Sequence, residues 1–222
     1  MKKYFVLVIA AVTSFSVSAQ KIKVKESDEN IGGGSHNSLV VNLYDISPSD
    51  ADDAFRSYMK TYGGKRSSQD GGIFIDNATI KDMSNNTVDV YGKAQGKKGD
   101  KEITYIISFD LGGVFLNSSD HKDKYKVAEK LVKDFAVSTC KDIIEQELKV
   151  ANKKESNLES DQKDLEKENR NLNSDIEDYK AKIKKAESNL VTNKSDQEKK
   201  KSEIDVQKKV VSDVEIKLKA IE

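Results

Sequence analysis

The C-terminal third of the chain carries its most regular pattern of hydrophobic and polar positions. From residue 144 onward, core positions recur alternately three and four residues apart, and this spacing never slips. Sixteen of these 23 positions are apolar, whereas hydrophobic residues make up 36% of the whole chain. Lys and Glu fill the other faces of the predicted helix. This pattern predicts a coiled-coil helical tail over residues 144–222. Its predicted interface residues are Leu158, Leu165, Leu172, Ile176, Tyr179, Ile183, Leu190, Ile204, Val211, Val214 and Leu218.

Three consecutive core positions of the tail are polar. They are Asn193, Gln197 and Lys200. They surround the polar run 192–196, and Ser195 with Glu198 has the spacing of a capping box that starts a new helix. These features favour a hairpin tip at 192–196, where the tail folds back as an αα-hairpin.

An uninterrupted helix paired with another chain is the rival interpretation. The unbroken register favours it, and Asn169 at a core position is typical of two-stranded coiled coils. Val206, Val210 and Ile216 lie off the core positions and widen the apolar face, which suggests a third helix. A charged, solvated helix without any partner is a further alternative.

Residues 38–143 predict a compact α+β head domain. Residues 39–44 indicate a buried strand, and a helix is expected from Pro48, capped by Ser47 and stopped by Gly63. Alternating apolar residues near 73–80, 88–94 and 103–109 indicate three more strands with polar turns between them. A second amphipathic helix is expected from about Asp120. The predicted order is β-α-β-β-β-α, a small antiparallel sheet with packed helices.

The first residues have the pattern of a secretory signal peptide. Lys2 and Lys3 precede an apolar stretch at 4–12, and small residues at Val17 and Ala19 flank an expected cleavage after Ala19. Residues 20–37, with three consecutive glycines at 32–34, have the composition of a flexible linker. After signal removal we expect no membrane span, and a periplasmic or secreted location. The predominance of Lys (35) over Arg (3) suggests an AT-rich bacterial genome.

Composition and candidate chemistry argue against several classes of function. The chain has 38 Lys+Arg and 38 Asp+Glu, so it lacks the basic excess of a nucleic-acid-binding protein. We expect no catalytic residues, no metal site and no cofactor. The two histidines are His36, in the expected linker, and His121, beside acidic residues that are typical of helix capping. Cys140 falls in the apolar stripe of the second helix, where a buried packing role is expected.

These patterns favour an exported, non-enzymatic cell-envelope protein that acts as a scaffold or adaptor through its coiled coil. The expected partner is another protein or a second copy of the chain. One alternative is a binding module whose head holds a small ligand or peptide. A compact body with a helical arm also resembles in outline the Skp-type chaperones, and this resemblance of architecture implies a periplasmic holdase as a further alternative.

Overall fold

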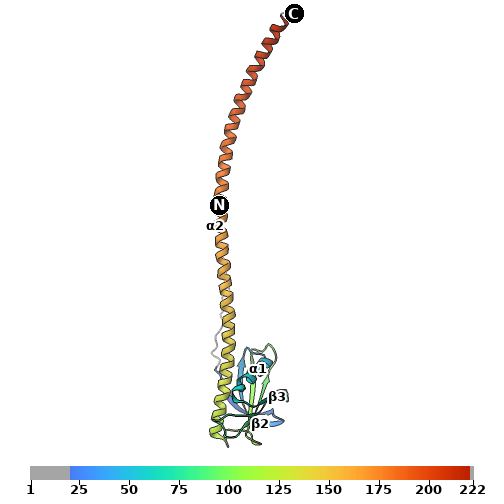
Figure 1. Cartoon of the computed structure of the whole chain (residues 1–222), viewed down its shortest axis with the longest axis vertical. Helices are drawn as coiled ribbons and strands as arrows, with labels where there is room; N and C mark the ends of the chain where they lie inside the picture. Colours follow the sequence, from blue (N-terminus) through green and yellow to red (C-terminus); the bar gives the residue numbers. More distant parts are fainter. Residues whose placement is uncertain (1–20, 221–222) are drawn as a thin grey trace. The chain divides into compact units, whose positions relative to one another are not determined.

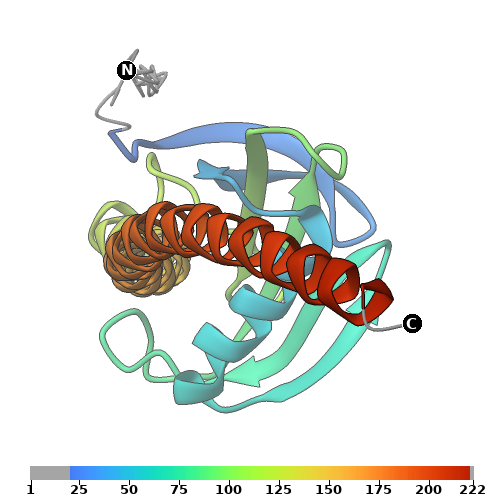
Figure 2. The same ribbon diagram turned by 90° about the horizontal axis from the view of Figure 1, so that it is seen from above.

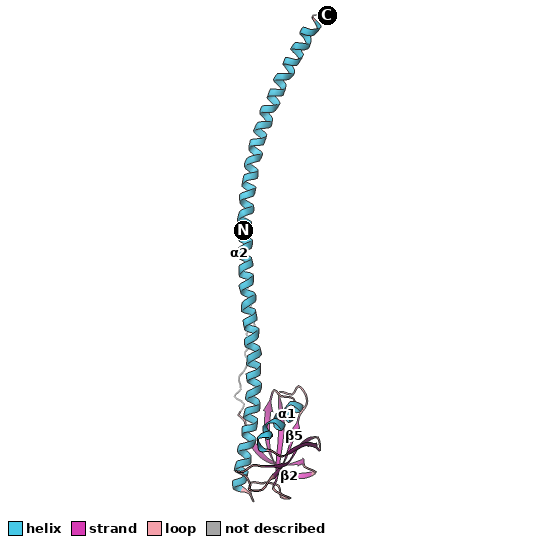
Figure 3. Ribbon diagram, in the orientation of Figure 1, coloured by secondary structure: helices cyan, strands magenta, loops and turns pink. Residues whose placement is uncertain are grey.

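The computed structural model describes residues 21–220, which fall into two units that meet between Val150 and Ala151. The first unit holds all the strands, coloured magenta in Figure 3, and the described part of the second unit is wholly helical. The predicted signal peptide at 1–19 lies outside the described residues. The predicted boundary after residue 143 lies seven residues before the boundary between the units.

The elements follow the order β-β-α-β-β-β-β-α, with a 3₁₀ turn after the first helix (Figure 1). They are β1 (Val24–Ile31), β2 (Gly34–Tyr44), α1 (Pro48–Tyr58), η1 (Met59–Tyr62), β3 (Lys65–Gln69), β4 (Gly72–Ala78), β5 (Val88–Gln95), β6 (Glu102–Asp110) and α2 (Lys122–Lys219). The predicted α+β class is confirmed.

The six strands form one antiparallel sheet in the order β1-β2-β6-β5-β4-β3. Strands β2 and β6 pair near the middle of this order, with Leu39 opposite Ile107 and Leu43 opposite Ile103. The connection through α1 carries the chain from β2 to β3 at the far edge. Figure 2 shows α1 lying across the strands. Alternate residues of β2, β4, β5 and β6 face the helices and form the core.

Helix α1 begins and ends where the sequence predicts. The Ser47 hydroxyl oxygen accepts a hydrogen bond from the Asp50 N–H at 3.2 Å, and Pro48 occupies the first turn. The chain tightens into η1 and stops at Gly63, whose φ of 70° is a conformation that glycine adopts without strain. Ala51, Phe55 and Met59 are buried against the sheet.

The expectation of a flexible linker over residues 20–37 is wrong for residues 24–37. These residues form β1 and the beginning of β2, which pair as a hairpin with Ile31 opposite Gly34. Gly32 and Gly33, with φ of 66° and 84°, make the tight turn between the strands. The predicted head start at residue 38 therefore falls inside β2.

The other missed strand is β3, so the predicted order β-α-β-β-β-α lacks two strands. Both missed strands lie at the edges of the sheet and carry polar or charged side chains along most of their length. Exposed edge strands are commonly charged, which prevents edge-to-edge association. Such strands do not alternate between apolar and polar residues, and the hydrophobic pattern therefore did not reveal them.

The turn expected at 192–196 does not form, since all five residues lie within α2. None of them is Gly or Pro, the residues that most often end a helix, and the helical backbone continues through this segment. The Thr192 hydroxyl donates to the Ser188 carbonyl at 3.3 Å, and the Gln197 amide donates to Asn193 Oδ1 at 2.5 Å. The polar residues that suggested a break are accommodated by bonds within consecutive turns of one helix.

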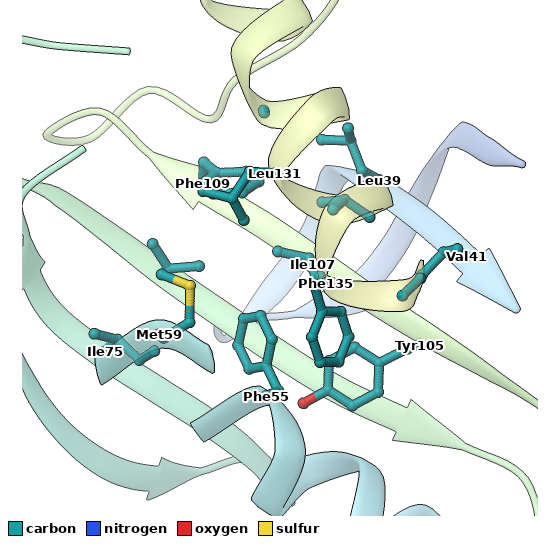
Figure 4. Close-up of a cluster of buried hydrophobic side chains, with 14 of the residues drawn as sticks. Leu39, Val41, Phe55, Met59, Ile75, Tyr105, Ile107, Phe109, Leu131 and Phe135 are labelled. Atoms are coloured by element: carbon teal, nitrogen blue, oxygen red, sulfur yellow. The ribbon is translucent and has the colours of Figure 1, made fainter. Parts of the chain in front are cut away.

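Three aromatic rings hold the helices of the first unit onto the sheet (Figure 4). Phe55 from α1, Tyr105 from β6 and Phe135 from α2 are fully buried, and their ring centroids lie 5.2–5.3 Å apart. The Tyr58 hydroxyl adds a hydrogen bond to the Leu131 carbonyl at 3.2 Å. Aromatic pairs at these distances stabilise a core beyond the burial of their area.

Gly92 on β5 lies directly beneath this cluster, and we expect Gly92→Ala to lower the free energy of unfolding by about 2 kcal/mol. A Cβ at this position would lie 2.4 Å from a Phe55 ring carbon and 3.0 Å from the Tyr105 hydroxyl. Phe55 cannot move away easily, because Tyr105 and Phe135 contact its other sides. Urea unfolding followed by circular dichroism measures the effect, with exposed Lys101→Ala as the control. Equal stability of Gly92→Ala and the native protein would contradict this packing.

Candidate functional site: the uncovered seam of helix α2

The predicted coiled-coil residues lie along one face of α2 in the second unit, and none of them is buried. We call these eleven residues, from Leu158 to Leu218, the seam. Their exposed fractions lie between 48% and 63%. Residues three and four apart on a helix are neighbours on its surface, so the seam forms an apolar strip that is unbroken from Leu172 to Leu190 and is interrupted elsewhere by polar core positions. The structure thus brings the predicted residues onto one face and leaves that face open.

The helix has little else within its own chain to stabilise it between Ala151 and Lys219. Every residue in this range is exposed. Two ion pairs form there, Lys180 with Glu177 at 2.7 Å and Lys200 with Glu203 at 2.5 Å, and all four side chains are largely solvated. Surface pairs of this kind contribute about 0.2–1 kcal/mol each. A charged helix that stands alone needs many such pairs, and only these two are found between residues 151 and 219.

The polar core positions make hydrogen bonds to side chains one turn further along the helix. The Asn173 amide donates to the Asn169 backbone carbonyl at 2.7 Å and to Asn169 Oδ1 at 2.8 Å. Gln162 donates to Glu166 Oε1 at 2.9 Å. Such partners lower the cost of placing an amide in an interface. The polar interruptions are therefore compatible with a paired helix.

Four further exposed valine or isoleucine residues lie off the seam in the second unit. They are Val191, Val206, Val210 and Ile216, with exposed fractions from 46% to 71%. Three of them follow Lys200, so the apolar surface of the helix widens toward its C-terminal part. The heptad pattern predicted the seam. It does not predict these four residues, which lie outside its core positions.

His36 and Cys140 occupy structural positions in the first unit. His36 lies on β2 and stacks on Phe115, with ring centroids 3.6 Å apart, so its assignment to a linker is corrected. Cys140 is half-buried against the core, where burial raises the pKa of its thiol and makes the reactive thiolate less accessible. Among residues 21–220, no group of three His, Cys, Asp or Glu side chains is placed to hold a metal ion.

A row of stacked rings is a feature of the head that the sequence patterns did not reveal. Phe74 stacks on Tyr91 at 4.8 Å, and Tyr91 lies 6.0 Å from Phe115, which stacks on His36. Tyr91 alternates with buried Val90 and Gly92, so the row lies on the sheet face opposite the helices. The rings are half-buried against one another, and this cluster packs that face of the sheet.

A cavity of about 500 Å³ lies between α1 and residues 138–146 of α2 in the head. Its lining combines the carboxyl groups of Asp45, Asp50 and Asp142 and hydroxyl groups that include Tyr58 with the apolar side chains of Ile46, Ala54 and Ile143. The lining is therefore mixed and carries three carboxyl groups, in contrast to the apolar seam.

No protein-family model, curated protein or solved structure matches this chain. Within residues 21–220, no helix combines the length and the apolar character that a membrane span requires.

Asp52 is the carboxylate most closely tied to the head core. The Tyr105 hydroxyl donates to Asp52 Oδ1 at 3.0 Å. Burial raises the pKa of Asp52 above its ordinary value of 3.8, and the hydrogen bonds from Tyr105 and the Ala94 backbone offset this effect only in part. Between pH 3.8 and the raised pKa, the folded protein therefore holds more protons than the unfolded chain.

It follows that the ionisation of Asp52 lowers the free energy of unfolding as the pH rises through this window. Asp52→Asn removes this dependence, so we expect the native protein to lose stability relative to the variant between about pH 3.5 and about pH 7. Urea unfolding of both proteins at the two pH values measures the change. Asp53→Asn, on the exposed side of the same helix, is the matched control. A native protein that gains stability relative to Asp52→Asn over this range would contradict the assignment.

Proposed function

We propose that this chain is an exported, non-enzymatic protein of the cell envelope that acts as a scaffold or adaptor by pairing the seam of α2 with another helix. The observation that carries the proposal is the apolar strip of eleven exposed seam residues, which is unbroken from Leu172 to Leu190. A contiguous exposed apolar surface of this kind marks a protein interaction site. The regular spacing of the strip fits a helix as the partner.

The energetics support this role for the seam. Each Leu or Ile that passes from an exposed to a buried position contributes about 1.5–3 kcal/mol. Leu158, Leu165, Leu172, Ile176 and Ile183 are seam residues with roughly half of their surface or more exposed. A partner helix would therefore stabilise both the complex and the helical state of residues 151–219.

The second candidate function is a module that binds a ligand in its head. The side chains of the head support this function less strongly than the seam supports an interaction. The rings of Phe74, Tyr91, Phe115 and His36 already cover one another, and three carboxyl groups line the cavity beside α1. Ligand sites are usually apolar clefts with a few polar groups. The seam is the larger apolar surface without an occupant, and we therefore place the function there.

Export is the part of the proposal that the sequence alone supports. A positive start, a short apolar stretch and a small residue at Ala19 are the parts of a cleavable signal. We expect the mature protein purified from its own cells to begin at Gln20, as read by mass spectrometry of the intact chain and its N-terminal peptide. A mature chain that retains residues 1–19 in the cytoplasmic fraction would contradict export.

Photo-crosslinking in the producing cells tests the interaction. A benzophenone amino acid placed at Tyr179, in the seam, should give a discrete adduct, whereas the same group at Ala181, on the outer face, should not. Leu190→Asp should abolish the adduct, because a charge in the seam opposes its burial. Val191→Asp is the matched control, since Val191 is the exposed neighbour just outside the seam. That control should leave the adduct unchanged.

Two outcomes count against the proposed function. The first is the lack of any adduct at Tyr179 while the full-length protein accumulates. The second is equal adduct formation at Tyr179 and Ala181, which would show that contact there is not specific to the seam. The apparent mass of the adduct then separates a second copy from a different protein.

A further inference from the structure

We infer that the partner of the seam is a second copy of this chain, and that the two helices pair parallel and in register over residues 154–208. This inference rests on the proposed function and names its partner. Two features of the second unit carry it: the kinds of apolar residue at alternate seam positions, and the charges that flank the seam.

The alternate positions of the seam differ in side-chain type. One set carries β-branched Ile176, Ile183, Ile204 and Val211 together with Leu190 and Leu218, and the other set carries Leu158, Leu165 and Leu172 together with Tyr179 and Val214. β-Branched residues at the first core position (a) of each heptad and Leu at the second (d) favour two parallel strands. Asn169 occupies a first core position, where a polar amide specifies register and a two-stranded state.

The charges beside the seam are complementary in a parallel pair. Each heptad has a residue just before its first core position, called g, and a residue just after its second core position, called e. In a parallel pair, each g residue of one helix meets the e residue of the other helix that lies five positions later in sequence. Five such pairs carry opposite charges. They are Lys154–Glu159, Asp175–Lys180, Lys182–Glu187, Asp196–Lys201 and Glu203–Lys208. One pair, Asp161–Glu166, carries like charges, and every attractive pair occurs twice in a symmetric dimer.

These pairs cannot form within one chain. Residues five apart lie about 140° apart around a helix, so their side chains point away from each other. The ion pairs that the second unit does form join residues three apart, as in Lys180–Glu177. Opposite charges five residues apart therefore cannot stabilise a single helix by forming an ion pair. They can attract each other only across two paired helices.

An antiparallel pair fits the charges less well. One antiparallel register would match polar core positions, with Asn169 opposite Asn193 and Gln162 opposite Lys200. The same register sets like charges against each other beside the seam. The repulsive contacts would be Asp161 with Glu203, Glu168 with Asp196, and Lys180 and Lys182 each with its own copy, whereas only Glu159 with Lys201 and Glu166 with Lys194 would attract. Like charges at these flanking positions oppose an orientation, so the parallel arrangement is favoured.

Two charged core positions, Lys200 and Glu155, meet their own copies in the parallel register, and each has a counter-charge nearby. Lys200 pairs with Glu203 within the same helix at 2.5 Å. Glu155 follows Lys154, the flanking residue that reaches across to the second copy. Glu155 lies at the start of the paired region, where water reaches it easily, whereas Lys200 lies inside that region.

The test uses full-length mature protein and measures the dimer dissociation constant by sedimentation equilibrium. Lys182→Glu alone, and Glu187→Lys alone, should each raise this constant about tenfold, because two attractive pairs become repulsive. A mixture of the two single variants should restore tight binding as a heterodimer, since the carboxylate introduced on one chain then faces the ammonium introduced on the other. Lys185→Glu, on the outer face, is the control and should change the constant by less than about twofold.

Two results would overturn the inference, and neither one by itself overturns the proposed function. A dimer whose single variants do not recover on mixing would show that the helices are not parallel and in register. A monomer at every concentration, together with an adduct to a different protein at Tyr179 in cells, would show that the seam binds another chain. The lack of any Tyr179 adduct is the separate outcome that removes the proposed function as well.

Discussion

The uncovered apolar seam of α2 is the feature on which this account of the protein depends. Between Ala151 and Lys219 the helix buries no residue within its own chain, and its ion pairs there are few and solvated. In proteins, most of the stability of a helix comes from packing an apolar face rather than from intrinsic propensity. We therefore propose that this helix gains its stability from a second helix, so that its folding and its interaction are one event.

The first unit packs its apolar faces against one another within the same chain. Its sheet buries one face under α1 and the beginning of α2, and the rings of Phe55, Tyr105 and Phe135 fill the space between them. Gly92 leaves room for the Phe55 ring, so the absence of a side chain on β5 is part of the fit. The opposite face carries its own cluster around Tyr91. The head is thus a self-contained fold, whereas the helical unit is not.

The sequence predicted the parts of this structure that rest on hydrophobic periodicity. Helix α1 with its Ser47 cap, the strands near the middle of the sheet and all eleven seam residues follow from spacing alone. Strands β1 and β3 were missed because edge strands carry charge instead of alternating apolar residues. The hairpin expected at 192–196 was wrong, since polar core residues are tolerated in a continuous helix when neighbours one turn away bind them. No residue of 21–220 covers the seam, so the pattern predicts an interface without identifying its other side.

Hydrogen exchange of the mature protein at two concentrations tests the central claim most directly. One concentration should lie well above the dissociation constant for self-association and the other well below it. The account predicts that backbone amides in 151–219 are protected at the higher concentration and exchange rapidly at the lower one, while amides of β2 and β6 stay equally protected. Equal, strong protection of 151–219 when the protein is monomeric would show that the helix stands alone, and it would contradict the account.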